Sequence, residues 1–194
     1  MFAVPVAAPQ IWLFEFFGLL FCALVVSAML RRPREKAARR NSTSRHGIIL
    51  QNIGIFCTAI GPARPQLGWL SPPAIAAYMI ILLLMSSAIG LFVWSSTWLG
   101  KNWSLEARML EDHQLVRTGP YAHVRHPIYF AMLLLLLSMA LAFGHWLQLA
   151  LAVPVFVVGT KMRTDAEEQL LEESFGDAFR DYRSSTPAII PRFS

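Results

Sequence analysis

The residues best suited to chemistry stand together in residues 113–129, HQLVRTGPYAHVRHPIY. This stretch holds three His, two Arg, two Pro and two Tyr, and it leads without a linker into the apolar run FAMLLLLLSMALAF. Polar and ionisable side chains at the mouth of a membrane helix are costly to keep unless they bind something. We therefore expect a binding site at this edge of a bilayer.

A second polar cluster follows the last apolar run of the chain. Arg163 and Glu167 are four residues apart, so they share one face of a helix, and Glu168 stands beside them. One interpretation is an ion pair on a solvated helix, which contributes about 0.2–0.5 kcal/mol. The other is a binding pair, because a guanidinium grips a carboxylate in a bidentate way and a carboxylate can hold a cation or a sugar hydroxyl. Both interpretations stay open.

The start of the helix after the first cluster offers another binding feature. Pro127 suits the first position of a helix, with His126 or Arg125 at the cap. The backbone N–H groups of a first helical turn have no partner within the helix, so they are available to an anionic group. Gly119 and Pro120 predict a turn that folds the preceding segment back over this helix start.

The elements that must position these residues are apolar. Of 194 residues, 55% are hydrophobic and 15% charged, which is typical of a membrane protein. Apolar runs at residues 11–30, 47–60, 72–94, 128–143 and 146–160 predict about five transmembrane helices, the last two forming a hairpin broken at residues 144–145. Gln51 and Asn52, within the second run, can hydrogen-bond across helices as structural glue.

The segment after the fifth run predicts a surface helix. Over residues 161–182 the apolar positions recur at a spacing of three to four residues, and Pro187 and Pro191 end the segment. We expect one amphipathic helix that lies on the membrane face or folds over the central polar segment. The predicted fold is all-α: a polytopic integral membrane protein of one domain (1–194), with N-terminal transmembrane helices (1–94) and a C-terminal half (95–194) that carries the site.

The charge distribution predicts an orientation. Seven of the 17 Lys and Arg residues lie in residues 31–45, directly after the first run. The positive-inside rule places this loop in the cytoplasm and the N-terminus outside, so that the site and the C-terminal helix face the cytoplasm. Attraction of the loop to anionic lipids is a weaker alternative. A nucleic-acid partner is not expected, because the basic block has no accompanying aromatic or groove-fitting motif.

Several common site types lack support in the sequence. There is no GxGxxG after a strand, no GxxxxGK, no HExxH and no GxSxG. His123 and His126 stand three apart and could share a metal ion, but no carboxylate stands next to them, so we predict no metal site.

The two clusters together resemble a known family. HQLVRTGPYAHVRHPIY is similar to the signature of the isoprenylcysteine carboxyl methyltransferase family, integral membrane enzymes related to the phospholipid methyltransferases. An apolar hairpin follows, then an R-x-x-x-E pattern and a stretch ending in FGDAFRDYRSSTPAIIP, like the tail of that family. The resemblance covers residues 99–191 and rests on two separate motifs at suitable spacing.

The resemblance implies S-adenosylmethionine as methyl donor, with S-adenosylhomocysteine as product, and a lipid-like prenylcysteine that enters from the bilayer as acceptor. Arg163 would bind the acceptor carboxylate, and Glu167 would join it as the second catalytic residue while also contacting the cofactor. The remaining implied cofactor contacts are His113, Gln114, Leu115, Val116, Gly119, Tyr121, His126, Pro127, Ile128 and Tyr129.

Elementary chemistry agrees with this assignment. An α-carboxyl group has a pKa of about 3.3–3.7 and is already ionised at neutral pH, so its methylation requires no general base. The enzyme has to align the reacting atoms and exclude water. A phospholipid amine N-methyltransferase is the first alternative, and it would need a base such as Glu167 or His126. An NADPH-dependent sterol-type reductase and a non-catalytic membrane scaffold are further alternatives.

Overall fold

The computed structural model describes residues 3–31 and 39–191 of the chain. Five long helices account for most of it, and each coincides with one of the apolar runs. They are α1 (Ala8–Leu30), α2 (Thr43–Cys57), α3 (Pro72–Leu99), α4 (Pro127–Phe143) and α5 (Trp146–Phe175). Helix α2 ends at Cys57, before the end of the run at residues 47–60. The third helix begins at the predicted Ser71–Pro72 boundary but continues to Leu99, five residues beyond the predicted end. Its last turns, VWSSTWL, carry no helix-breaking residue before Gly100, which explains the extension.

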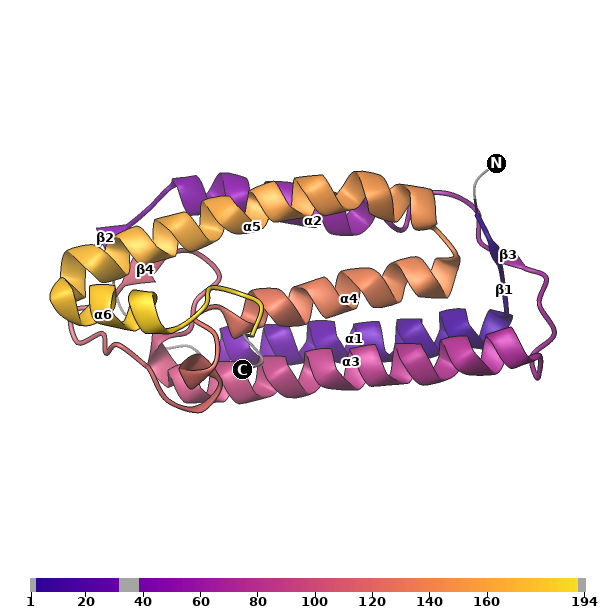
Figure 1. The fold of residues 1–194 in the computed structure, drawn as a ribbon, viewed down its shortest axis with the longest axis horizontal. Coiled ribbons are helices and arrows are strands. Elements are labelled where there is room, and N and C mark those ends of the chain that lie inside the picture. Colours follow the sequence, from indigo (N-terminus) through magenta and orange to yellow (C-terminus); the bar gives the residue numbers. More distant parts are fainter. Residues whose placement is uncertain (1–2, 32–38, 192–194) are drawn as a thin grey trace.

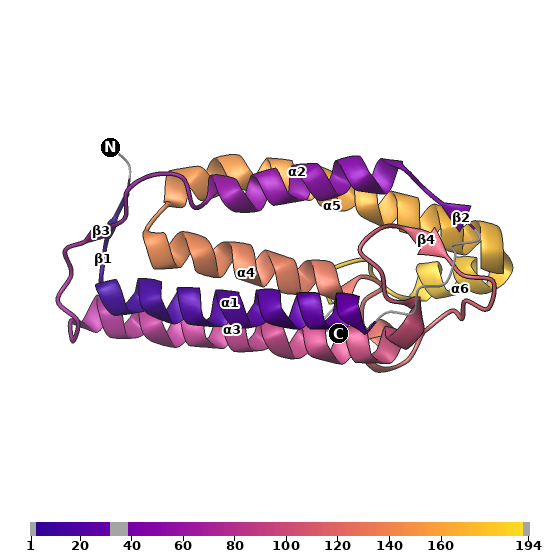
Figure 2. The same cartoon turned by 180° about the vertical axis from the view of Figure 1, so that it is seen from behind.

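The helices pack in two groups, one of α2 and α5 and the other of α1, α3 and α4 (Figures 1 and 2). In one group α2 runs along α5, and in the other α3 packs against α1 and α4. Two very short strand pairs lie at opposite ends of the bundle. Parallel β1 (Pro5–Val6) and β3 (Arg64–Pro65) lie at one end, and antiparallel β2 (Arg39–Arg40) and β4 (Arg108–Met109) at the other.

Glycines allow α2 and α5 to approach closely. A Cβ on Gly47 would lie 2.7 Å from the carbonyl oxygen of Gly159, and a Cβ on Gly159 would lie 2.6 Å from the backbone nitrogen of Gln51. Neither position has room for a side chain. Small residues at a helix interface let two backbones come together in this way within a membrane. The contact brings the buried side chains of α2 against those of α5.

The hairpin between α4 and α5 forms where it was predicted. Gly144 ends α4 in the left-handed conformation, with a φ of 69°. His145 follows it and is fully buried, and its Nδ1 lies 2.8 Å from the carbonyl oxygen of Thr58 at the end of α2. The hairpin is therefore fixed to the second helix as well as to its own two arms.

The outer faces of the bundle are apolar. Leu19 and Leu30 on α1 and Leu83 on α3 are 72%, 81% and 65% exposed, as expected for side chains that face lipid. Two helices of the described chain, α1 and the helix that starts at Pro72, are long and apolar enough to cross a membrane, and α4 is a shorter apolar helix. The structure therefore supports a mostly helical chain with two candidate membrane spans, whereas the count of five crossings stays a prediction.

The segment after the fifth apolar run differs from the prediction of one helix over residues 161–182. α5 continues without a break from its apolar part to Phe175, and Gly176, with a φ of 52°, then turns the chain. A separate helix α6 (Asp177–Ser185) follows. The periodic apolar residues identified the helical faces, but they could not show this break, which depends on one glycine in a conformation that other residues rarely adopt.

Candidate active site

A cavity of about 770 Å³ extends from the polar end of the bundle along its apolar interior. The start of α4, the polar part of α5 and the segment between α3 and α4 line its polar end, while α1, α2 and the middle of α4 line the apolar part. The two sequence clusters therefore meet at one cavity. Every residue predicted to contact cofactor or acceptor lines it, with the exception of Gly119.

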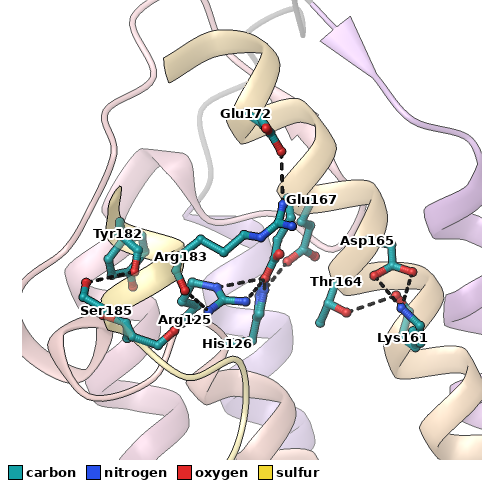
Figure 3. A network of polar contacts seen from close by, with 12 residues as sticks. Arg125, His126, Lys161, Thr164, Asp165, Glu167, Glu172, Tyr182, Arg183 and Ser185 are labelled. Carbon is teal, nitrogen blue, oxygen red and sulfur yellow. Dashed lines mark hydrogen bonds and ion pairs between the residues drawn. The ribbon is translucent and has the colours of Figure 1, made fainter. Parts of the chain in front are cut away.

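Glu167 is the residue that joins the two clusters. Its carboxylate accepts a hydrogen bond from the hydroxyl of Tyr129, and its Oε2 lies 3.4 Å from Nδ1 of His126. The side chain of Glu167 is 26% exposed, and it lines the cavity. The other imidazole nitrogen of His126, Nε2, lies 2.9 Å from Oε1 of Glu168. The buried ring thus contacts two carboxylates. Figure 3 shows His126 and Glu167 within this polar network.

This arrangement sets the protonation of the three groups. Burial alone would lower the pKa of His126, but the hydrogen bonds and negative charges of Glu167 and Glu168 outweigh it and raise the pKa. Burial would raise the pKa of the Glu167 and Glu168 carboxyl groups, but their hydrogen bonds to His126 and its charge lower it. The charge of Arg163 lowers the pKa of Glu167 further, and that of Arg125 lowers the pKa of Glu168. These contacts therefore favour an imidazolium held by two carboxylates, and the lowered pKa of Glu167 makes it a weaker base.

Arg125 connects this cluster to the end of the chain. Its Nη2 and Nε lie 2.8 and 2.9 Å from Oε1 of Glu168, and its Nη1 donates to the carbonyl oxygens of Arg183 and Thr186. The backbone N–H of Arg125 donates to Pro187 at 2.9 Å, and that of His126 to Ala188 at 2.8 Å. We call residues 186–188 the C-terminal strap, because these bonds hold it across the start of α4.

The strap changes the interpretation of the helix start. The N–H groups near the start of α4 were expected to be available to an anion, but two of them, from Arg125 and His126, already donate to the strap. A third, from Tyr129, donates to the carbonyl oxygen of His126 at 3.2 Å. Anion binding at this helix start is therefore weaker than expected.

Helix α6 packs against the central polar segment. Phe179 is fully buried, and the hydroxyl of Tyr182 donates to the carbonyl oxygen of Tyr121 at 2.6 Å. Both aromatic residues line the cavity. Burial is the main cause that raises the pKa of Tyr182 to about 12, so this hydroxyl stays a donor. The second of the two predicted positions for the C-terminal helix is thus the one that the structure adopts.

Arg163 is held in a different way from Arg125. It is 5% exposed, and its guanidinium donates to Oε1 of Gln51 and, at 2.8 Å, to the carbonyl oxygen of Leu105. Its Cζ lies 4.8 Å from the centre of the Tyr129 ring, a cation–π distance. Within the described residues no hydrogen bond or ion pair joins Arg163 to a carboxylate, so the solvated ion pair with Glu167 is not formed. The positive charge of Arg163 still acts on Glu167 at a distance and contributes to the lowered pKa of that carboxyl group.

The segment from His113 to Val116 lines the cavity as predicted, and it presents polar atoms without partners. Nδ1 of His113 and Oδ1 of Asn102 are buried and have no hydrogen-bond partner among the described residues. Burial, followed by the positive charge of Arg108, lowers the pKa of His113, so its ring is neutral at neutral pH. Buried polar atoms without partners are rare in folded proteins, and here they mark where a ligand would bind.

Gly119 has a conformational role. Its φ is 62°, and a Cβ at this position would lie 2.6 Å from the ring of Trp98. It begins the short 3-10 helix Gly119–Ala122, which brings Tyr121 to the cavity wall. Its predicted contact with a cofactor therefore lacks support from the cavity.

Sequence reasoning missed several residues of this site. Arg125 was considered only as a helix cap, Glu168 only as a neighbour of Glu167, and Asn102 and Leu105 not at all. The R-H-P pattern next to a later E-E pair was a usable signal for Arg125 and Glu168. No pattern indicates the roles of Asn102 and Leu105, which depend on the path of an irregular segment.

A metal site has no support in the part of the chain that the structure describes. There, no group of three or more His, Cys, Asp and Glu residues is arranged to hold a metal ion. His126, which could have shared an ion with His123, contacts Glu167 and Glu168.

Comparison with known proteins points to one family. The model of the isoprenylcysteine carboxyl methyltransferase family matches residues 79–173, from within α3 nearly to the end of α5. The protein-S-isoprenylcysteine O-methyltransferase of Schizosaccharomyces pombe is 35% identical over 81 residues, and that of Dictyostelium discoideum is 30% identical over 89 residues. Each match covers 42% of this chain and 34% of the relative, so the matched part spans about a third of each relative's length. Residues 79–173 of the chain are thus similar to the isoprenylcysteine carboxyl methyltransferase family and to these two enzymes.

Proposed function

We propose that this protein is an S-adenosylmethionine-dependent methyltransferase that esterifies the carboxylate of a prenylated cysteine, or of a similar lipid-like thioether acid. The family and the names of the two relatives support a carboxyl methyltransferase. The observation that carries the proposal is the state of Arg163, a buried cation in a cavity wall with only neutral partners.

A buried charge whose direct partners are all neutral is costly, so its retention requires a reason. Arg163 is fixed by an amide oxygen, a carbonyl oxygen and an aromatic face, and its buried Nε has no partner among the described residues. A carboxylate that enters the cavity would supply the missing charge. Guanidinium binds carboxylate through short, charge-assisted hydrogen bonds, which would also orient the reacting oxygen.

The residues around the cavity suit S-adenosylmethionine. Glu167 offers a carboxylate to the ribose hydroxyls, and the unpartnered atoms of His113 and Asn102 offer an acceptor or donor to the polar groups of the cofactor. Leu115 and Val116 provide an apolar surface for an adenine ring. When bound, the cofactor supplies a sulfonium methyl group that an ionised carboxylate takes as a methyl ester, while the electron pair of the broken carbon–sulfur bond stays on sulfur.

The protonation of the site favours a carboxylate acceptor over an amine. An ionised carboxylate reacts without losing a proton, whereas a protonated amine needs a base. The two candidate bases are Glu167, whose pKa is lowered, and His126, whose two carboxylate partners raise its pKa and so favour its protonated form. The phospholipid amine N-methyltransferase therefore stays the weaker alternative.

The apolar part of the cavity is the proposed path for the acceptor's lipid chain. Along α4 the lining runs from Ile128 to Met139, which corresponds to about 16 Å of helix. Phe14 and Val25 on α1 and Ile55 on α2 line the same space. Lipid-like acceptors could enter here from the bilayer while their polar end reaches Arg163.

We also propose that the chain forms one membrane domain with five crossings and the site on the cytoplasmic side. α2, from the N-terminal half, packs along α5, which supports a single domain. The end of α1 and strand β2, which flank the basic loop, lie at the same end of the bundle as the site (Figure 1). Residues 32–38 of that loop lie outside the described residues, so its attraction to lipid headgroups stays a prediction.

Transfer of a tritiated methyl group from S-adenosylmethionine to N-acetyl-farnesylcysteine tests the proposal. We expect base-labile label in the acceptor, as a methyl ester gives, and none in phosphatidylethanolamine. Label in phosphatidylethanolamine alone would favour the amine methyltransferase. Titration calorimetry with S-adenosylhomocysteine is the companion measurement, since absence of binding in detergent and in lipid would favour a reductase or a scaffold.

A further inference from the structure

Gln51 is a completely buried amide in α2, a helix outside the segment that matches the family. Its Nε2 donates to the hydroxyl of Thr160 at 2.8 Å, and its Oε1 accepts a hydrogen bond from Nη1 of Arg163. Arginine has donors only, so the oxygen of the amide must face the guanidinium. The bond to Thr160 fixes the opposite end of the amide and prevents it from turning over.

The close contact between α2 and α5 places this amide. Gly47, one turn before Gln51, lies so near Arg163 that a Cβ there would be 2.6 Å from its Cγ. Gly159 lies against the backbone of Gln51 in the same way. The two glycines thus bring the backbones to a separation at which a Gln side chain reaches both Thr160 and Arg163.

The groups in direct contact with the guanidinium are all neutral, and the carboxylate of Glu167 acts on it only at a distance. Gln51 and Leu105 bind two of its nitrogens with neutral oxygen atoms, and the Tyr129 ring lies under its Cζ. Together they fix its plane. Nε stays buried without a partner among the described residues. A cation fixed in orientation but not neutralised is suited to bind an anion that arrives in the cavity.

We infer that Gln51 is a positioning residue that orients Arg163 with a neutral oxygen, and so gives the cavity its preference for a carboxylate over an uncharged acceptor. This inference deepens the proposed function and rests on it for the identity of the acceptor. Glu at position 51 would place an opposite charge on the guanidinium and compete with the acceptor. Leu would leave Nη1 without its acceptor and free the guanidinium to turn.

Binding preference is the property to measure, because a merely structural role would not change it. The probes are N-acetyl-farnesylcysteine and the matching uncharged amide, N-acetyl-farnesylcysteine carboxamide, titrated into the full chain in detergent. The ratio of the two dissociation constants is the carboxylate preference. We expect the Gln51→Glu variant to lower this ratio at least about tenfold, because charge-assisted hydrogen bonds contribute about 1.5–3 kcal/mol. Affinity for the amide should stay within about twofold of that of the wild type.

Two variants guard against an effect of folding or of added charge. Gln148→Glu adds the same charge near the other end of α5, where the amide of Gln148 donates to the carbonyl oxygen of Ile60, and it should leave the preference unchanged. Gln51→Leu adds no charge and should weaken the preference less than Gln51→Glu does. Binding of S-adenosylhomocysteine, measured for every variant, shows that the fold and the cofactor site are intact.

The outcomes separate this inference from the proposed function. If the wild type methylates the acid and Gln51→Glu keeps the full carboxylate preference, the inference is overturned while the function stands. If the wild type transfers no methyl group but prefers the acid, and Gln51→Glu loses that preference, the function fails and the role of Gln51 stands. A wild type that binds acid and amide equally would overturn both.

Discussion

Two arginines, the partly buried Arg125 and the buried Arg163, lie at the polar end of the same bundle and have opposite kinds of partner. Arg125 binds the carboxylate of Glu168 and the carbonyl groups of the C-terminal segment, so its charge is compensated within the protein. Arg163 binds an amide, a carbonyl group and an aromatic face, so its charge is not. The type of partner thus separates the arginine that holds the fold together from the one proposed to bind the acceptor.

Replacement of Arg163 should give the largest effect on the reaction. We expect Arg163→Gln to reduce kcat/KM for the carboxylate acceptor at least about a hundredfold, because two charge-assisted hydrogen bonds to the acceptor are lost. Methyl transfer from labelled cofactor measures this. The affinity for S-adenosylhomocysteine should hardly change, and Arg45→Gln, which removes an exposed arginine bound to Glu106, is the control. Parallel loss of cofactor binding would mean that Arg163 is structural, like Arg125.

Replacement of Arg125 should instead destabilise the fold. Arg125→Gln leaves Glu168 with less compensation and releases the strap, and loss of one partner of a buried pair costs up to about 3–5 kcal/mol. The pair is 11% and 15% exposed, so we expect a smaller loss, visible as a fall in Tm of roughly 5 °C.

Thermal unfolding and limited proteolysis after residue 185 measure this effect of Arg125. Arg180→Gln is the control, because it removes an exposed pair with Asp177 that should contribute little to stability. An unchanged Tm combined with lost acceptor binding would remove the contrast between the two arginines.

Replacement of Glu167 should affect the cofactor before the acceptor. Glu167→Gln keeps the shape of the side chain but removes the charge that faces His126 and the cavity. We expect S-adenosylhomocysteine to bind about tenfold more weakly, as for the loss of one charged hydrogen bond. Calorimetry measures this, with Glu172→Gln as the control, since Glu172 pairs with Arg183 at the surface. Unchanged cofactor affinity would assign Glu167 to the structural side of the comparison.

The sequence predicted the helices well and the contacts of the site unevenly. Apolar runs placed all five long helices and the hairpin at Gly144, because helix formation in apolar surroundings depends on local composition. The i,i+4 spacing correctly placed Arg163 and Glu167 on one helix, but it favoured neither the amide of Gln51 nor the ring of His126 as partner. Gln51 lies 112 residues from Arg163 in the sequence, and His126 lies 41 residues from Glu167. Local patterns carry no information on such contacts.

The pH dependence of stability should give the smallest effect, and it tests whether the His126 cluster is as charged as its contacts indicate. The pKa of His126 is raised above its unfolded value of about 6.5, so its contribution is complete below that pH and is lost as the pH rises through the folded pKa. The pKa values of Glu167 and Glu168 are lowered, so their contributions are present above about pH 4.3 and are lost as the pH falls through their folded values. Stability should therefore be greatest between these two limits.

His126→Gln should lower Tm at pH 6 by about 2–4 °C more than at pH 9, because at high pH the wild type has already lost the imidazolium. His46→Gln, on an exposed position of α2, should show no such difference. A difference in Tm between wild type and His126→Gln that is constant from pH 5 to pH 10 would mean that the ring acts through packing alone. Glu168 would then hold Arg125, and with it the strap, without a second cation.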